Sequence, residues 1–408
     1  MTSNGRLGPG IAKLNDDVLR FLFTFSADIE PLRISPSTND ICLGWVLLTH
    51  VCRRWRLVIC NMGELWAANL CCIPAAFDTF LSRAGGRPLT FDYPLRCLPP
   101  LPPPQAIIDL ALHHIERVSQ LCVPLGYRGW TALHDRPLPC LQRICFLNFR
   151  ERTPEGTIRL NSPNLKEVNI LYMPVAFLAP KLSSLVVSMH PTSPLLLLET
   201  LAHSPSLQHL ALHITTSAPN PWDNYTGDII HLSRLLELKI AIKGPTGASG
   251  FLRRVRVANN VNIHVSAQFP FTLDPATIAA LAPYILNPGF DTLRLQYSAF
   301  QNLYGIEVFV HGTAVHDNNM PDHPRVNLYW VGWHAAVQGE IPDGILDSYS
   351  RTLQLALDQS SADRIDRIEL EGMEDIYASG FPPVRDAIHR FSHAKKVLAD
   401  VECAEDHT

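Results

Sequence analysis

The sequence predicts an α + α/β fold, with a small helical module at the N-terminus followed by an irregular solenoid of short parallel strands with helices. Two observations lead to this prediction. Apolar residues recur at helical spacing between residues 14 and 58, and a hydrophobic-x-x-hydrophobic-x-hydrophobic unit recurs from Val118 onward. With 47% hydrophobic and 18% charged residues among 408, the chain has the composition of a folded globular protein.

The first predicted helix begins after Asn15. The Asn15 side chain can cap a helix because its oxygen accepts from a free backbone N–H, and Asp16 and Asp17 follow where the helix dipole favours negative charge. An apolar stripe then covers one helical face. It consists of Val18, Leu19, Leu22 and Phe23.

A second helical segment follows further along the chain. Its apolar residues recur at spacings of three and four: Leu48, Val51, Cys52, Trp55 and Val58. Two short amphipathic helices cannot bury all of this apolar surface by themselves, which indicates docking into a partner's groove. The alternative is that these side chains pack on the domain that follows.

The two segments resemble the F-box, the helical module that docks onto the Skp adaptor of cullin–RING ubiquitin ligases. Residues 49–56, Thr-His-Val-Cys-Arg-Arg-Trp-Arg, and residues 81–89 are similar to a version common in mushroom-forming fungi. Asn15 and Gly63 stand where that family usually has proline. The resemblance implies that the adaptor contacts Leu14, Asp17, Val18, Leu19, Leu22, Phe23, Leu48, Val51, Trp55, Leu65 and Trp66.

The predicted domain organisation follows the changes in composition. We expect a flexible N-terminus at 1–12, the F-box-like module at 13–72, and a connecting helix with a proline-rich linker at 73–104. The linker contains Pro99-Pro-Leu-Pro-Pro-Pro104, a stiff polyproline-type segment. A leucine-rich-repeat-like domain at 105–402 and a tail at 403–408 complete the chain.

The repeated unit predicts the strands of the second domain. Its copies are residues 118–123, 141–146, 165–170, 182–187, 207–212, 235–240 and 252–257. Four copies carry a proline two places before the first leucine, at Pro139, Pro163, Pro180 and Pro205. This pattern resembles divergent leucine-rich repeats, without their asparagine ladder, and places a helix at 195–202 on the convex side. A doubly wound α/β domain is the alternative.

Beyond residue 257 the spacing becomes irregular. Later candidate strands are residues 293–295, 305–310, 326–330 and 365–370. Candidate helices are Pro275–Ile285 and Asp343–Leu357, capped by Asp274 and Asp343.

Residues that read a substrate are expected on the outward side of the repeat strands. Candidates are Arg143, Lys166, His209, Arg254 and Arg256, together with Trp222 as an exposed loop aromatic. A solvated strand face and ordinary loop packing are the alternatives.

No catalytic motif, phosphate-binding loop or zinc-site spacing occurs, so we expect no enzyme activity, cofactor or metal. A net charge of −4 argues against nucleic-acid or membrane binding. The ten cysteines form no CxxC pair and are interpreted as reduced, small buried residues. A cytoplasmic and/or nuclear protein is expected, since no signal segment is present.

Together these observations predict the substrate-recognition adaptor of a Skp–cullin–F-box type ubiquitin ligase, with an unknown protein target. The alternative is an interaction scaffold with a drifted F-box that no longer joins a ligase. Asn15 and Gly63 keep this alternative open.

Overall fold

The computed structural model divides the chain into two compact units, residues 1–152 with 160–165 and residues 153–159 with 166–408. It describes residues 14–34, 41–92, 105–123, 131–134, 136–147, 158–171, 175–189, 194–214, 222, 225–242, 248–258, 260–268, 275–285, 292–300, 303–311, 325–333, 367–371 and 396–399. In these ranges no helix is both long enough and apolar enough to cross a membrane.

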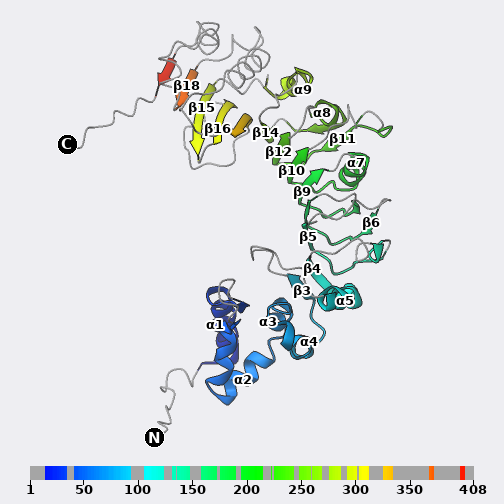
Figure 1. The fold of residues 1–408 in the computed structure, drawn as a ribbon, viewed down its shortest axis with the longest axis vertical. Helices are drawn as coiled ribbons and strands as arrows, with labels where there is room; N and C mark the ends of the chain where they lie inside the picture. The colour runs from blue at the N-terminus through cyan, green and yellow to red at the C-terminus, as the bar shows by residue number, and fades with distance from the viewer. Residues whose placement is uncertain are drawn as a thin grey trace, which may run out of the picture. The chain divides into compact units, whose positions relative to one another are not determined.

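The chain begins with helices and then adds strands (Figure 1). The elements up to residue 147 are α1 (Asp16–Ile29), β1 (Arg33–Ile34), β2 (Ile41–Cys42), the 3₁₀ helix η2 (Gly44–His50), α2 (Arg53–Cys60), α3 (Gly63–Ala68), η3 (Pro74–Ala76), α4 (Phe77–Ala84), β3 (Leu89–Asp92), α5 (Gln105–His113), η4 (Ile115–Arg117), β4 (Val118–Cys122) and β5 (Arg143–Leu147).

A chain of aromatic rings holds the helical module together. Trp66 of α3 lies edge-on between Trp45 and Phe80, with ring centroids 4.9 and 5.0 Å away. Its indole N–H donates to the Ile59 carbonyl at 2.8 Å, so burial leaves no unpaired donor on this side chain. Trp45, Trp66 and Phe80 are all buried, and they join η2, α3 and α4 in one core.

Gly44 allows η2 to approach the end of α1. Its φ is +48°, and a Cβ at this position would lie 2.2 Å from the Glu30 carbonyl oxygen. The close approach lets the Trp45 N–H donate to that same carbonyl at 3.1 Å. Only glycine fits this position, because it has no Cβ and accepts a positive φ.

Three parallel strands follow the helices in the first unit, in the order β5-β4-β3. Phe91 of β3, Leu121 of β4 and Ile144 of β5 are paired in register, and all three are buried. The neighbouring positions on each strand point to the opposite face of the sheet.

The second part of the chain contains the remaining elements. They are β6 (Ile158–Asn161), β7 (Glu167–Leu171), β8 (Val175–Leu178), β9 (Ser184–Met189), α7 (Pro194–Ala202), β10 (His209–Ile214), β11 (Ile230–Leu232), β12 (Glu237–Ile242), α8 (Ser249–Arg254), β13 (Val255–Val257), β14 (Asn262–Gln268), α9 (Pro275–Ile285), β15 (Thr292–Phe300), β16 (Leu303–His311), β17 (Arg325–Trp333), β18 (Arg367–Glu371) and β19 (Lys396–Ala399).

The strands β7, β9, β10, β12 and β14 pair in parallel, in that order. Helices interleave with them, and Figure 1 shows α7 and α8 on the same side of the strands. Val168, Leu185, Leu210, Leu238 and Ile263 form one buried row across the five strands. The described chain is therefore a mixed α/β protein with N-terminal helices and, between residues 89 and 268, eight parallel strands of the main sheet, three in the first unit and five in the second.

A hydrogen-bonded turn starts five of the seven predicted repeats. The first leucine of five copies donates its N–H to the carbonyl three residues earlier, at 3.0–3.3 Å. These buried leucines are Leu141, Leu165, Leu182, Leu207 and Leu235. In the first four turns proline occupies the second position, where its fixed φ suits the turn. The strand itself begins two residues after the leucine.

A second set of hydrogen bonds joins each turn to the one before it. In the second unit, the Ser183 N–H donates to the Lys166 carbonyl, and the Gln208 N–H donates to the Ser183 carbonyl. The Leu236 N–H donates to the Gln208 carbonyl, and the Asn262 N–H donates to the Leu236 carbonyl. All four distances are 2.8–2.9 Å. The buried Ser204 hydroxyl donates to the Thr200 carbonyl at 2.8 Å and also lies 3.5 Å from the Ala179 carbonyl of the preceding turn. Each repeat therefore satisfies backbone groups of the repeat before it.

The prediction of a strand at residues 252–257 is wrong. This segment lies in α8 up to Arg254, and the three-residue β13 that follows pairs with β11. Phe251, Leu252 and Val255 are spaced for a helix as well as for the repeat, so the pattern could not separate the two. The next strand of the parallel sheet is β14, whose turn leucine position is taken by Val261. Only Asn262 separates Val261 from the apolar Ile263, one residue fewer than the repeat requires.

The parallel arrangement does not continue to the end of the chain. The strand β16 runs antiparallel to both β15 and β17, although β14 and β17 are parallel. Only two residues separate β15 from β16, whereas a parallel connection needs about a dozen residues. The expectation of short parallel repeats up to residue 402 is therefore wrong for these strands.

Two predicted helices match the structure closely, at α7 and α9. Other predicted features lie outside the described residues. They are the N-terminus at 1–12, the proline-rich segment at 99–104, the cap Asp274, the helix at 343–357 and the tail at 403–408.

Adjacent leucines before β12 provide a test of the repeat. Leu235 is 1% exposed in its turn, whereas Leu236 is 49% exposed. We expect Leu235→Ala to lower the free energy of unfolding by about 2–5 kcal/mol, because it leaves a cavity. Leu236→Ala should change it by less than about 0.5 kcal/mol. Urea titration followed by tryptophan fluorescence measures both, and equal shifts would contradict the assigned turn.

Candidate functional site

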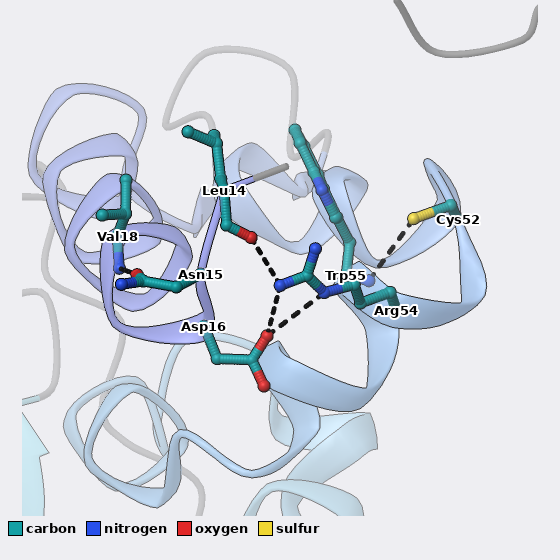
Figure 2. Close-up of polar contacts among 7 residues, drawn as sticks. All are labelled: Leu14, Asn15, Asp16, Val18, Cys52, Arg54 and Trp55. Carbon is teal, nitrogen blue, oxygen red and sulfur yellow. Dashed lines mark hydrogen bonds and ion pairs between the residues drawn. The ribbon is translucent and has the colours of Figure 1, made fainter. Parts of the chain in front are cut away.

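The helix α1 begins as the sequence predicts. The Asn15 side-chain oxygen accepts from the Val18 N–H at 2.8 Å, which confirms the N-cap (Figure 2). Arg54 of α2 joins the two helices, donating to Asp16 Oδ1 at 2.8 Å and to the Leu14 carbonyl at 2.5 Å. Figure 2 also shows Cys52 at the start of α2, where its sulfur accepts from the Trp55 N–H at 3.5 Å.

One face of α1 packs against the rest of the module. Leu19 and Phe23 are 0% and 1% exposed, and the Phe23 ring contacts Trp55 of α2 edge-on with centroids 5.1 Å apart. Burial of two such side chains contributes roughly 1.5–3 kcal/mol each. This inner face therefore fixes how α1 is rotated about its axis.

A second face of α1 is apolar and exposed. Its residues recur at i, i+3, i+4, i+7 and i+11, which places them on one side of a helix. We call this the outer stripe: Val18, Phe21, Leu22, Phe25 and Ile29. Phe21 is 70% exposed and Phe25 is 55% exposed, which is unusual for phenylalanine in a folded chain.

Further exposed apolar side chains belong to the same module. They are Ile41, Leu47, Val51 and Leu57. Among the described residues, nine of the twelve large exposed apolar side chains lie between residues 18 and 57. Such a concentration marks an interaction surface, because soluble proteins usually scatter these residues singly.

The structure separates the residues predicted to bind an adaptor into three groups. Asp17, Val18, Leu22 and Val51 are exposed, and Leu14, Leu48, Trp55 and Leu65 are half-buried. Leu19, Phe23 and Trp66 are buried in the core of the module. Phe21, Phe25 and Ile29 were missed, although their spacing from Val18 continues the same helical period.

The predicted substrate-binding residues lie on several different segments, in both units of the chain. Arg143 belongs to the first unit, and Lys166 and His209 are exposed in the second. The expectation that Trp222 is an exposed aromatic is wrong, because it is buried and packs against Phe251 at 5.3 Å between centroids.

The placement of Arg254 and Arg256 on the main repeat strands is also wrong. Arg254 ends α8 and lies over the Tyr225 ring at 6.0 Å, and Arg256 lies on β13. The cause is the mistaken strand at 252–257.

Charged side chains meet on the open face of the second unit's parallel sheet. Glu237 of β12 contacts Lys239 at 2.8 Å, His209 of β10 at 3.7 Å and His264 of β14 at 4.0 Å. Partial burial raises the pKa of Glu237, but the hydrogen bond with Lys239 and the surrounding positive charges outweigh it and lower the pKa overall. A charged, partly solvated cluster of this kind suits recognition of a polar protein surface.

The described residues contain no group of three His, Cys, Asp or Glu side chains that could hold a metal ion. Comparison with protein-family models, with curated proteins and with solved structures finds no match. The features that point to a function are therefore the exposed apolar residues of the helical module and the charged open face of the sheet.

The cap of α1 can be tested directly. Asn15→Ala removes the acceptor for the Val18 N–H and should lower the free energy of unfolding of the module by about 1 kcal/mol. Asn15→Asp keeps an acceptor and should remain close to the wild type. Thermal unfolding followed by circular dichroism compares the two, and an equal loss in both variants would contradict the capping role.

Proposed function

We propose that this protein is the substrate-recognition adaptor of a Skp–cullin–F-box type ubiquitin ligase, and that α1 docks onto the Skp adaptor through the outer stripe. The observation that carries the proposal is the second apolar face of α1, whose five residues are each left 38–70% exposed by the described module. A helix with this pattern is the form that binds in an apolar groove.

The energetics favour docking over solvent exposure. Complete burial of a Phe, Leu, Ile or Val side chain contributes about 1.5–3 kcal/mol, so five such residues offset a substantial part of the cost of association. The inner face adds rigidity, because Leu19 and Phe23 already hold α1 against α2. A preformed helix loses little further entropy when it binds.

The F-box resemblance supplies the identity of the partner. The residues that carry it, from Leu14 to Phe23 and from Thr49 to Arg56, form α1, η2 and α2, which also hold the exposed apolar side chains. Neither Asn15 nor Gly63 weakens the helices at the family's proline positions. Asn15 caps α1, and Gly63 begins α3 with its Cα close to the Ala84 carbonyl, where an added Cβ would lie 3.0 Å away.

In the same proposal, the parallel strands form a leucine-rich-repeat-like solenoid that presents a target protein. The turn and the inter-turn hydrogen bonds recur with each copy, as expected for stacked units. The buried Ser162 hydroxyl donates to the Leu138 carbonyl of the preceding turn, a link between turns of the kind that the missing asparagine ladder would supply. The open face around Glu237 is the surface assigned to the target.

The docking proposal predicts a loss of binding from two surface changes. In the full-length protein, Val18→Asp with Phe21→Asp places two carboxylates in the outer stripe, where docking would have to desolvate them. We expect affinity for purified Skp adaptor to fall by at least about tenfold per substitution, since each loses more than about 1.4 kcal/mol. Isothermal titration calorimetry measures the change.

A matched control lies on the same helix. Thr24 is exposed on α1 but outside the outer stripe, so Thr24→Asp adds the same charge and should leave the affinity unchanged. Wild-type protein that shows no affinity for the Skp adaptor while retaining its helical circular dichroism would overturn the proposal.

A further inference from the structure

Two cysteines lie next to each other on neighbouring strands of the first unit. The strands β4 and β5 run parallel, with Gln120 opposite Arg143 and Leu121 opposite Ile144. Extending this register by one residue places Cys122 opposite Cys145, and the side-chain hydrogen bond between them agrees with that placement. Neighbouring strands are about 4.8 Å apart, and a disulfide requires Cα atoms about 4.4–6.8 Å apart, so the Cα separation between the two strands is compatible with a disulfide.

The two thiols already interact. Cys122 and Cys145 share a side-chain hydrogen bond, in which the Cys122 thiol donates to the Cys145 sulfur. This bond is the largest influence on both groups. It lowers the pKa of Cys145 to about 7 and raises the pKa of Cys122. The nearby Arg143 also favours the Cys145 thiolate, while burial and Asp92 oppose it.

The solvent exposure of the two cysteines indicates which one is oxidised first. Cys122 is 4% exposed, whereas Cys145 is half-buried and can be reached from solvent. Thiolates, not thiols, are the nucleophiles that peroxides oxidise. Cys145 is therefore the residue that reacts first, with Cys122 positioned behind it.

We propose that Cys122 and Cys145 form a peroxide-sensitive dithiol that closes into a reversible cross-strand disulfide. The Cys145 thiolate attacks an oxygen of hydrogen peroxide, the O–O bond breaks, and the products are the Cys145 sulfenic acid and hydroxide, which takes up a proton to become water. The Cys122 sulfur then attacks the Cys145 sulfur, the S–O bond breaks, and the thiol proton leaves with the hydroxyl group as a second water. Both sulfurs are oxidised and one peroxide is reduced.

Another cysteine pair in the same unit shows why the arrangement matters. Cys71 and Cys72 are neighbours in sequence, and burial raises their pKa values to about 12 and about 11. These thiols stay protonated at neutral pH and should react slowly. Sequence proximity therefore does not create a reactive pair here, whereas strand register does.

The disulfide would alter the open face of the three-stranded sheet. Arg143 lies two residues before Cys145 on the same face, so oxidation removes a negative thiolate from beside a positive side chain. A bond between adjacent strands has to shorten the usual separation of Cβ atoms, and strained disulfides are easily reduced. This inference is independent of the docking proposal, because it involves no residue of α1.

Trypsin makes the test direct. Cleavage after Arg117, Arg128, Arg143 and Arg150 releases residues 118–128 and 144–150, which contain Cys122 and Cys145 as their only cysteines. Reduced full-length protein is treated with graded hydrogen peroxide, alkylated with iodoacetamide, digested and analysed by mass spectrometry. We expect the two peptides linked, at their summed mass minus two hydrogens, and released again by dithiothreitol.

Two variants separate this pair from general oxidation. Cys145→Ser should abolish the linked species and leave Cys122 fully alkylated after unfolding, whereas Cys140→Ser, at a half-buried cysteine five residues earlier, should leave the linked species unchanged. A wild-type protein in which Cys145 proceeds to higher oxides unlinked, or joins any cysteine other than Cys122, would overturn the proposal.

A pH profile tests the thiol contact in the reduced protein. The rate of Cys145 alkylation should rise with pH about a midpoint near 7. In Cys122→Ala the stabilising donor is lost, so the midpoint should move to higher pH and the rate at pH 7 should fall. An unchanged midpoint in Cys122→Ala would contradict the hydrogen bond on which the pair depends.

Discussion

The edge-on contact between Phe23 and Trp55 is the interaction on which the orientation of α1 in the N-terminal module depends. It joins α1 to α2 and determines which side of α1 faces inward. Because Leu19 and Phe23 occupy that side, the outer stripe has no position other than solvent. The exposed phenylalanines are thus a consequence of the internal packing, and any partner meets a helix whose orientation is already set.

Local sequence signals predicted the elements whose causes are local. The cap at Asn15, the strands β5 and β7 that begin shortly after Pro139 and Pro163, and the helix α9 depend on residues within a few positions of each other. The helix α8 and the strand β14 were missed because both helix and repeat accept the spacing of Phe251, Leu252 and Val255. The antiparallel β16 depends on pairing between distant strands, which a repeat pattern cannot express.

The candidate site was predicted in its location and in some of its exposed residues, such as Val18 and Leu22, but not in Phe21, Phe25 and Ile29. Spacing alone assigns Val18, Leu19, Leu22 and Phe23 to one apolar region of α1. Distinguishing the inner residues from the outer ones requires knowing where Trp55 lies, which is a property of the folded chain. The same limit applies to Trp222, since its buried contact with Phe251 joins residues far apart in sequence.

The hydrogen bonds between successive turns have an evolutionary consequence. From Lys166 to Asn262, each turn donates to the turn before it, and these backbone bonds depend little on side-chain identity. A tandem duplication or deletion of one whole unit would therefore regenerate the same junction on both sides. Recombination within a gene can therefore lengthen or shorten the sheet by whole repeats. Inserting or deleting part of a repeat would instead disrupt the hydrogen bonds between turns on both sides of the change.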